Sequence, residues 1–211
     1  GSNFHIITGN ESAIRNIVRC VQKSGLIMDD LILEPLASSE SVLSEEEKEA
    51  GVALVDIGGG TSDIAIFQDN IIRHTAVIPL GGNTITEDVK EGCTIIKVQA
   101  EALKVKYGSC LAQQNRDDEI VSIPGLKGRP AKEISLRNLA NIIQARMEEI
   151  VEQINFEIEQ SGYKKKLIAG IVITGGGAQL KHLKELVEYT TGMECRIGIP
   201  CEKISTETNK E

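Results

Sequence analysis

Residues 56–63 read Asp-Ile-Gly-Gly-Gly-Thr-Ser-Asp, and they continue an apolar run that begins at Val52. A nearly continuous apolar run of this kind is typical of a buried strand. Successive glycines permit a tight turn and leave backbone amides bare enough to bind phosphate oxygens. Asp56, at the end of the strand, would face the same space and could hold Mg²⁺ through water. A hairpin that needs glycine only for its geometry explains this octapeptide about equally well.

A second glycine turn lies far along the chain. Gly175-Gly176-Gly177 follows the apolar run 170–174 and precedes a helical pattern. This arrangement suits the close passage of a nucleotide's sugar or phosphate, and the helix N-terminus adds a favourable dipole. Taken alone, such a turn is more often a compact strand-to-helix connection.

The segments around the first turn predict an antiparallel meander. Ile64–Phe67 and 71–78 are further apolar runs, separated by Asp69-Asn70. Between the meander and the apolar run 170–174 lie roughly ninety residues, which is more than a connection needs and predicts an inserted lobe. Apolar spacing and turn residues predict a helix after Asn10, a short strand at 31–33, a solvated acidic loop at 45–49, helices over 86–91, 94–107 and 135–160, a hairpin of 120–123 with 131–134, a helix from about 180 and a last strand at 195–199.

Three acidic or basic residues outside the turns are ambiguous. Glu101 and Lys104 are three apart on a predicted helix, so they share a face and could both reach a ribose. An ordinary surface ion pair is the commoner explanation. Glu34 follows the predicted strand at 31–33, where it could orient water or the metal shell, or cap the next helix.

Composition excludes several classes of protein. With 211 residues, 41% hydrophobic, the chain can bury a core, and its net charge of -8 argues against nucleic acid as the main partner. No C-x-x-C pair is present, and no P-loop motif or nucleophile motif near a histidine occurs. A cytosolic protein with reduced thiols is therefore predicted. The five cysteines are Cys20, Cys93, Cys110, Cys195 and Cys201.

Together these pieces resemble the actin-like ATPase superfamily. Glu34-Pro35-Leu36-Ala37 resembles its first connecting segment, 56–63 its second phosphate loop and 170–179 its adenosine loop. The helix that carries Glu101 and Lys104 matches the ribose and adenine side of the cleft. Within the superfamily, the sequence most closely resembles the FtsA family of bacterial cell-division proteins, from His5 to about Pro200.

The resemblance implies a ribonuclease-H-like α/β subdomain, 2A, over 51–92 and 167–191. Residues 93–166 would form an inserted α+β subdomain, 2B. Residues 1–50 would comprise a segment that packs with the other half of the molecule and a connecting helix, and 192–211 a final strand with a polar tail. The chain would be a C-terminal portion, since the superfamily's upstream Asp-x-Gly loop is absent from it. Alone it would bind ATP feebly or not at all and be inactive, and its full-length parent would be a weak ATPase at most.

The resemblance also implies a site for ATP and Mg²⁺. Asp56 would hold the metal's water shell and Glu34 the attacking water. The implied nucleotide-binding residues are Gly58, Gly59, Gly60, Thr61, Ser62, Asp63, Gly81, Glu101, Lys104, Gly175, Gly176, Gly177 and Gln179.

The implied partners belong to cell division. FtsA proteins polymerise, work with other division proteins and link the tubulin-like protein FtsZ to the inner face of the membrane. The C-terminal tail of FtsZ would dock on the helix from Ser135, with Arg137, Asn138 and Arg146 as contacts. Membrane attachment would need a C-terminal amphipathic helix that this sequence lacks. Another actin-fold protein, a pilus-assembly binding module or a small-molecule kinase, is the alternative.

Overall fold

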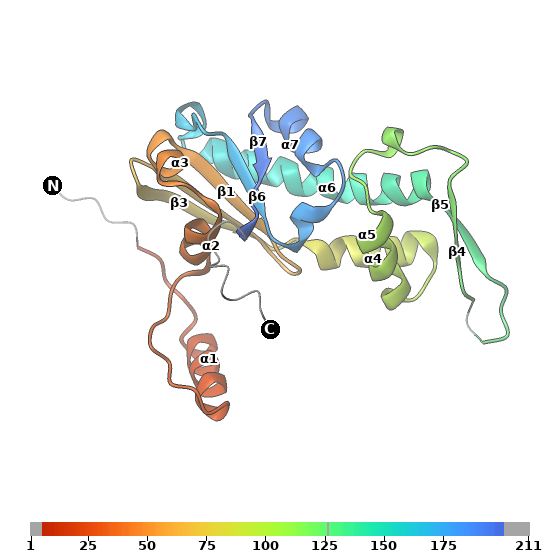
Figure 1. The fold of residues 1–211 in the computed structure, drawn as a ribbon, viewed down its shortest axis with the longest axis horizontal. Helices are drawn as coiled ribbons and strands as arrows, with labels where there is room; N and C mark the ends of the chain where they lie inside the picture. Colours follow the sequence, from red (N-terminus) through yellow and green to blue (C-terminus); the bar gives the residue numbers. More distant parts are fainter. Residues whose placement is uncertain (1–5, 126, 201–211) are drawn as a thin grey trace, which may run out of the picture.

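The computed structural model describes residues 6–125 and 127–200, and it is built on a five-stranded sheet of order β3-β2-β1-β6-β7 (Figure 1). β1 pairs antiparallel with β2, and β2 with β3, whereas β1–β6 and β6–β7 are parallel. The α/β class and the meander predicted from the sequence are therefore confirmed. The strands are β1 (Val52–Ile57), β2 (Ser62–Gln68), β3 (Ile71–Ile78), β6 (Ile171–Thr174) and β7 (Cys195–Ile197).

The turns of the meander follow from their residues. Asp69 and Asn70 have φ values of 54° and 58°, the left-handed conformation that a two-residue hairpin turn of the primed type requires. Aspartate and asparagine adopt this conformation more readily than other residues with side chains. The glycine turn between β1 and β2 closes with the Gly58 amide donating to the Thr61 carbonyl at 2.9 Å.

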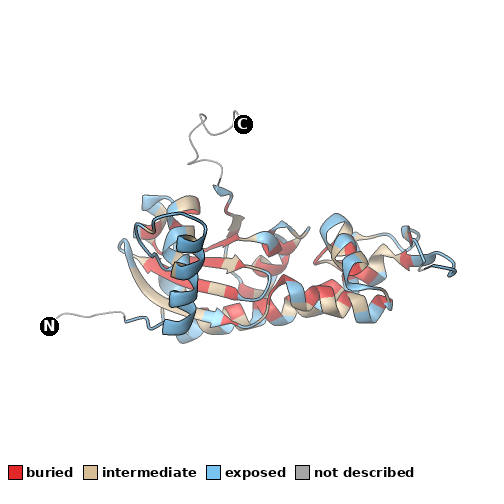
Figure 2. Cartoon of the chain, turned by 90° about the horizontal axis from the view of Figure 1, so that it is seen from below, coloured by how far each residue is buried: buried red, intermediate tan, exposed pale blue. Residues whose placement is uncertain are grey.

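α6 (Leu136–Gln160) is the long helix that the sequence predicted, and it contacts β2 and β3 of the sheet (Figure 1). The Ser135 hydroxyl accepts a hydrogen bond from the Asn138 amide and caps its start. One side of the helix is completely or almost completely buried and forms the centre of the main core (Figure 2). The residues of that side are Leu139, Ile143, Met147, Ile150, Ile154 and Ile158.

The alternation of side chains along β1 divides the core in two. Val55 and Ile57 point into the main core with α6, whereas Val52 and Leu54 join a smaller cluster with Leu43. That smaller cluster lies beneath the region where α2 (Glu34–Val42) leads into α3 (Glu45–Ala50). Asp56, two residues beyond Leu54, belongs to the α2 face of the sheet.

The segment between β3 and β6 contains α4 (Gly82–Cys93), α5 (Lys97–Tyr107), the hairpin β4 (Ile120–Ile123) and β5 (Lys132–Ser135), and α6. The hairpin and α5 lie beyond the end of the sheet (Figure 1). Arg146 on α6 pairs with Asp88 on α4 at 2.6 Å. The remaining elements are α1 (Glu11–Lys23), α7 (Leu183–Thr191) and the short 3-10 turns Ala112–Gln114, Lys164–Lys166 and Gly176–Gln179.

Two predicted elements are wrong. Residues 31–33 form no strand, since none of the strands in the described part of the chain pairs with them, and their side chains are exposed. Residues 45–49 are not a loop but most of α3, which a capping box between Ser44 and Glu47 stabilises.

Several boundaries also differ. α4 begins at Gly82 instead of 86, and α5 begins at Lys97 because Thr94 takes a left-handed cap conformation with φ 51°. The second hairpin strand is shifted by one residue, the 3-10 turn at 176–179 precedes α7, and the last strand ends at Ile197. α1 has the predicted Asn10 cap, although none of its residues is buried.

The four described cysteines are free. Burial raises the pKa of Cys110 and of Cys195 to about 12, which keeps both thiols protonated. Cys201, His5 and the polar tail lie outside the described residues. Within residues 6–125 and 127–200, no helix has the length and apolarity to cross a bilayer.

Candidate functional site

The two glycine turns lie at the same edge of the sheet. β1 and β6 are parallel neighbours with Asp56 opposite Thr174, so the turns that follow them leave the sheet side by side. The carboxyl end of parallel strands is where α/β sheets usually bind ligands. Both turns line one cavity of about 380 Å³. Its lining comprises Gly58, Gly59, Gly82, Asn83, Glu101, Lys104, Val105, Gly176, Gly177, Gln179 and Leu180.

The first turn is fixed by the start of α4. The amides of Gly82 and Asn83 donate to the carbonyls of Gly58 and Gly59, at 2.9 and 2.7 Å. These helix amides are thus committed to the turn. Among the described residues, the amides of Gly59 and Gly60 have no protein acceptor. Free amides in a glycine turn are the donors that a phosphate group needs.

Close backbone contacts explain why glycine is required around the cavity. A Cβ on Gly81 would lie 2.7 Å from the Gly58 carbonyl oxygen, and one on Gly175 would lie 2.4 Å from Asp56 Oδ1. A Cβ on Gly176, by contrast, would meet no atom within 4 Å. The backbone at 176 is therefore bare beside the cavity, as the approach of a nucleotide requires.

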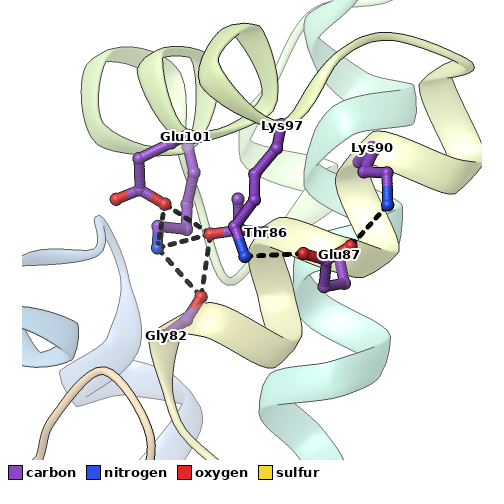
Figure 3. A network of polar contacts seen from close by, with 7 residues as sticks. Gly82, Thr86, Glu87, Lys90, Lys97 and Glu101 are labelled. Atoms are coloured by element: carbon purple, nitrogen blue, oxygen red, sulfur yellow. Dashed lines mark hydrogen bonds and ion pairs between the residues drawn. The ribbon is translucent and has the colours of Figure 1, made fainter.

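Glu101 and Lys104 belong to a partly buried polar network (Figure 3). The Lys104 ammonium donates to the Gly82 carbonyl at 2.9 Å, to Thr86 Oγ1 at 2.8 Å and to Glu101 Oε2 at 2.8 Å. The Thr86 hydroxyl also lies within hydrogen-bond distance of the Gly82 carbonyl and of Glu101 Oε2. The Lys104 ammonium thus already has three acceptors within the protein. Its side chain is 11% exposed, against 46% for Glu101.

The network keeps Glu101 ionised. Burial opposes the charge, but hydrogen bonds from Lys104 and Thr86 together with the Lys104 charge hold the pKa of Glu101 below its ordinary value. The second carboxylate oxygen, Oε1, accepts no hydrogen bond from the described residues. The arrangement therefore offers a charged acceptor at the cavity, suited to a ribose hydroxyl.

Asp56 does not line this cavity and lies beside Gly175, at the start of the second glycine turn. It lines a separate cavity of about 550 Å³ with Ser38, Ser41 and Gly175, and Gln179 lines both cavities. Glu34 is exposed in the first turn of α2 and lines neither cavity. The structure thus brings Asp56 to the site's edge and leaves Glu34 outside it.

The other residues of the first loop differ in orientation. Ser62 is fully buried, and its hydroxyl donates to the Leu80 carbonyl at 2.8 Å. Thr61 donates to Asp63 Oδ2 at 2.8 Å, and this pair is exposed. The cavity is also lined by Asn83, Val105 and Leu180, which no local motif in the sequence indicates.

Comparison with known proteins decides the family. The family model for the cell division protein FtsA matches residues 53–210. The chain belongs to the FtsA family. Its relatives include FtsA of Pseudomonas aeruginosa, 43% identical over 94% of this chain and 48% of the relative, and FtsA of Escherichia coli K12, 41% identical over 94% and 49%. The chain spans about half the length of the curated FtsA relatives it matches.

Solved structures confirm the actin-like fold of this FtsA-family chain. MreB5 of Spiroplasma citri, crystallised with AMPPNP, matches with a TM-score of 0.76 at 20% identity, covering 96% of this chain and 66% of MreB5. PilM, in the PilM–PilN type IV pilus biogenesis complex, matches with a TM-score of 0.67 at 16% identity, covering 94% and 53%. At these identities the likeness concerns the fold alone.

The expected partner-binding residues of the FtsA-family chain lie along α6. Arg137 pairs with Asp117 at 2.6 Å, and Arg146 pairs with Asp88 and Glu149. Asn138 is exposed. An acidic peptide would therefore have to compete with carboxylates of the chain itself for both guanidinium groups.

Proposed function

We propose that this chain supplies one wall of an ATP-binding cleft in an FtsA-type cell-division scaffold. The proposal is carried by one observation: two glycine turns more than a hundred residues apart share a cavity with an ionised carboxylate. MreB5, of similar fold, was crystallised with AMPPNP and with ADP. That likeness supports nucleotide as the ligand class.

Each part of the cavity suits a part of the nucleotide. The free amides of Gly59 and Gly60 would hold phosphate oxygens. The bare backbone at Gly176 would pass beneath the nucleoside, with Gly177 beside it in the lining of the cavity. Glu101 would accept a hydrogen bond from a ribose hydroxyl. Val105 and Leu180 supply apolar surface for the base.

Asp56 is the candidate for Mg²⁺, through water. A bound Mg²⁺ would neutralise phosphate charge and orient the terminal phosphate. Asp56 lies next to Gly175, at the end of β1 where the phosphate turn begins. Glu34 stays a candidate for orienting water only if the other half of the cleft brings a ligand to it. Thr61, Ser62, Asp63, Gly81 and Gln179 complete the proposed set.

Removing one charge in the cavity tests this function. In the full-length protein, Glu101→Gln is expected to weaken ATP binding about fivefold, because a neutral amide is a weaker acceptor for a ribose hydroxyl. Calorimetric titration with Mg-ATP measures the change. Glu87→Gln is the matched control, since Glu87 pairs with Lys90 and Lys97 on the same pair of helices but does not line the cavity. Equal effects of the two variants would count against the site.

The scaffold role is the second part of the proposal. Family membership supports polymerisation, work with other division proteins and tethering of FtsZ at the inner face of the membrane at the division site. Subdomain 2A would comprise 51–92 and 167–191, and 2B 93–166. The FtsZ tail would dock on α6 near Arg137, Asn138 and Arg146.

Charge removal at the start of α6 tests the docking proposal. Arg137→Ala is expected to weaken binding of an FtsZ tail peptide about threefold, and the difference should shrink at high salt because exposed ion pairs are screened. Fluorescence titration of labelled peptide measures it. Arg116→Ala removes another exposed arginine, paired with Asp118, and should leave binding unchanged. Loss of affinity in both variants alike would indicate a nonspecific charge effect.

A further inference from the structure

α2 carries three serines, and one of them behaves differently. Ser39 and Ser41 donate to carbonyls of their own helix, those of Leu36 and Ser38, each at 2.8 Å. Serine side chains within helices commonly form such hydrogen bonds to backbone carbonyls of the preceding turn. Ser38 instead donates across to the sheet, to Asp56 Oδ2 at 3.0 Å.

Asp56 lies between two other elements of the fold. The alternation of β1 turns its side chain to the α2 face, where Ser38 contacts Oδ2. The other oxygen, Oδ1, lies so close to Gly175 that a Cβ there would approach it to 2.4 Å. The carboxylate thus lies between α2 and the second glycine turn, and it accepts a hydrogen bond from outside its own strand.

α2 is itself anchored to the sheet. Arg196 on β7 donates to the Val42 carbonyl at 2.7 Å and pairs with Glu47 on α3 at 2.6 Å. The hydrogen bond from Arg196 is the largest cause of a lowered Glu47 pKa, so the pair stays charged. Val42 and Leu43 are buried in the smaller core. Ser38 therefore has a fixed position from which to orient a carboxylate.

We infer that Ser38 is a positioning residue that fixes Asp56 in the orientation from which it meets a hydrated Mg²⁺. This inference rests on the proposed function. Ser38 touches neither nucleotide nor metal in this scheme and acts only through Asp56. An Asp56 carboxylate that Ser38 already orients loses little side-chain entropy when it binds the metal's water shell. Without that hydrogen bond, the carboxylate would lose this entropy on binding, and Mg²⁺ would bind more weakly.

The test compares Mg²⁺ dependence in the full-length protein. Ser38→Ala is expected to raise the Mg²⁺ concentration for half-maximal ATP binding about threefold, while ATP affinity in EDTA stays the same. Ser38→Thr keeps the hydroxyl and should restore the wild-type requirement. Ser41→Ala is the matched control, a half-buried serine on the same helix and cavity that does not bond Asp56. Fluorescent ATP titrations measure both quantities, and thermal unfolding checks each variant.

The outcomes separate this inference from the function it rests on. A wild-type protein that binds no Mg-ATP removes both. If the wild type binds and Ser38→Ala has an unchanged Mg²⁺ requirement, the inference alone is overturned. The same holds if Ser38→Ala weakens ATP binding equally with Mg²⁺ and with EDTA, or if Ser41→Ala matches it, because either result indicates a purely structural hydroxyl.

Discussion

Replacing Gly175 by alanine is expected to lower the free energy of unfolding of this chain by about 3 kcal/mol. Gly175 has φ +87°, and a Cβ there would lie 2.4 Å from Asp56 Oδ1 and 2.6 Å from the Ile57 carbonyl oxygen. The new methyl group would therefore carry both backbone strain and overpacking against β1, which lies in the sheet's centre. Denaturant unfolding followed by circular dichroism measures the loss.

Gly162→Ala separates the two causes. Gly162 also has positive φ, +73°, but a Cβ there would meet no atom within 4 Å. Strain alone should then cost about 1 kcal/mol. If both alanines destabilise the chain equally, the close approach of the second glycine turn to β1 does not exist in solution.

Local patterns sufficed for the elements whose signals are local. Asp69-Asn70 between two apolar runs predicts a tight hairpin, and the structure has both residues at positive φ. The apolar spacing of α6 likewise predicts a helix from 135 to 160, with its buried side. That Gly59 and Gly176 meet in one cavity is a tertiary fact that depends on the parallel pairing of β1 with β6. No residue pattern shows which distant strands pair, and only the family resemblance suggested it.

The failures have physical causes. Leu31-Ile32-Leu33 has strand-forming residues, but a strand exists only where another backbone completes its ladder, and none of the described strands does so. At 45–49 the run of acidic residues predicts a solvated loop. The sequence also contains a helix-start signature there, because Ser44 lies three residues before Glu47 and the two form a capping box.

The candidate site was predictable in its backbone and less so in its side chains. The glycine turns and Asp56 directly follow or end apolar runs, so their place at the ends of strands can be predicted from the sequence. The role of Ser38 cannot be predicted in this way, because its hydrogen bond to Asp56 spans eighteen residues and depends on how α2 packs on the sheet. Ser62, in the same loop as the glycines, turns inward to the Leu80 carbonyl because the pleat of β2 directs it there.

Asp56→Ala in the full-length protein is expected to weaken Mg-ATP binding tenfold or more, on the order of 1.4 kcal/mol. The alanine removes the only proposed protein contact to the water shell of Mg²⁺ and leaves the glycine turns unchanged. Calorimetric titration at saturating Mg²⁺ measures the affinity. Asp118→Ala removes an equally negative residue from an exposed position between β3 and β6, paired with Arg116, and should have no effect.

The same titration in EDTA distinguishes a metal contact from a structural role. Without Mg²⁺ the Asp56 carboxylate can only repel the triphosphate, so its removal should leave ATP affinity unchanged or slightly raised. The sign of the effect thus depends on the ion. A tenfold loss in both conditions would mean that Asp56 acts by supporting Gly175 and α2, and would remove it from the metal site.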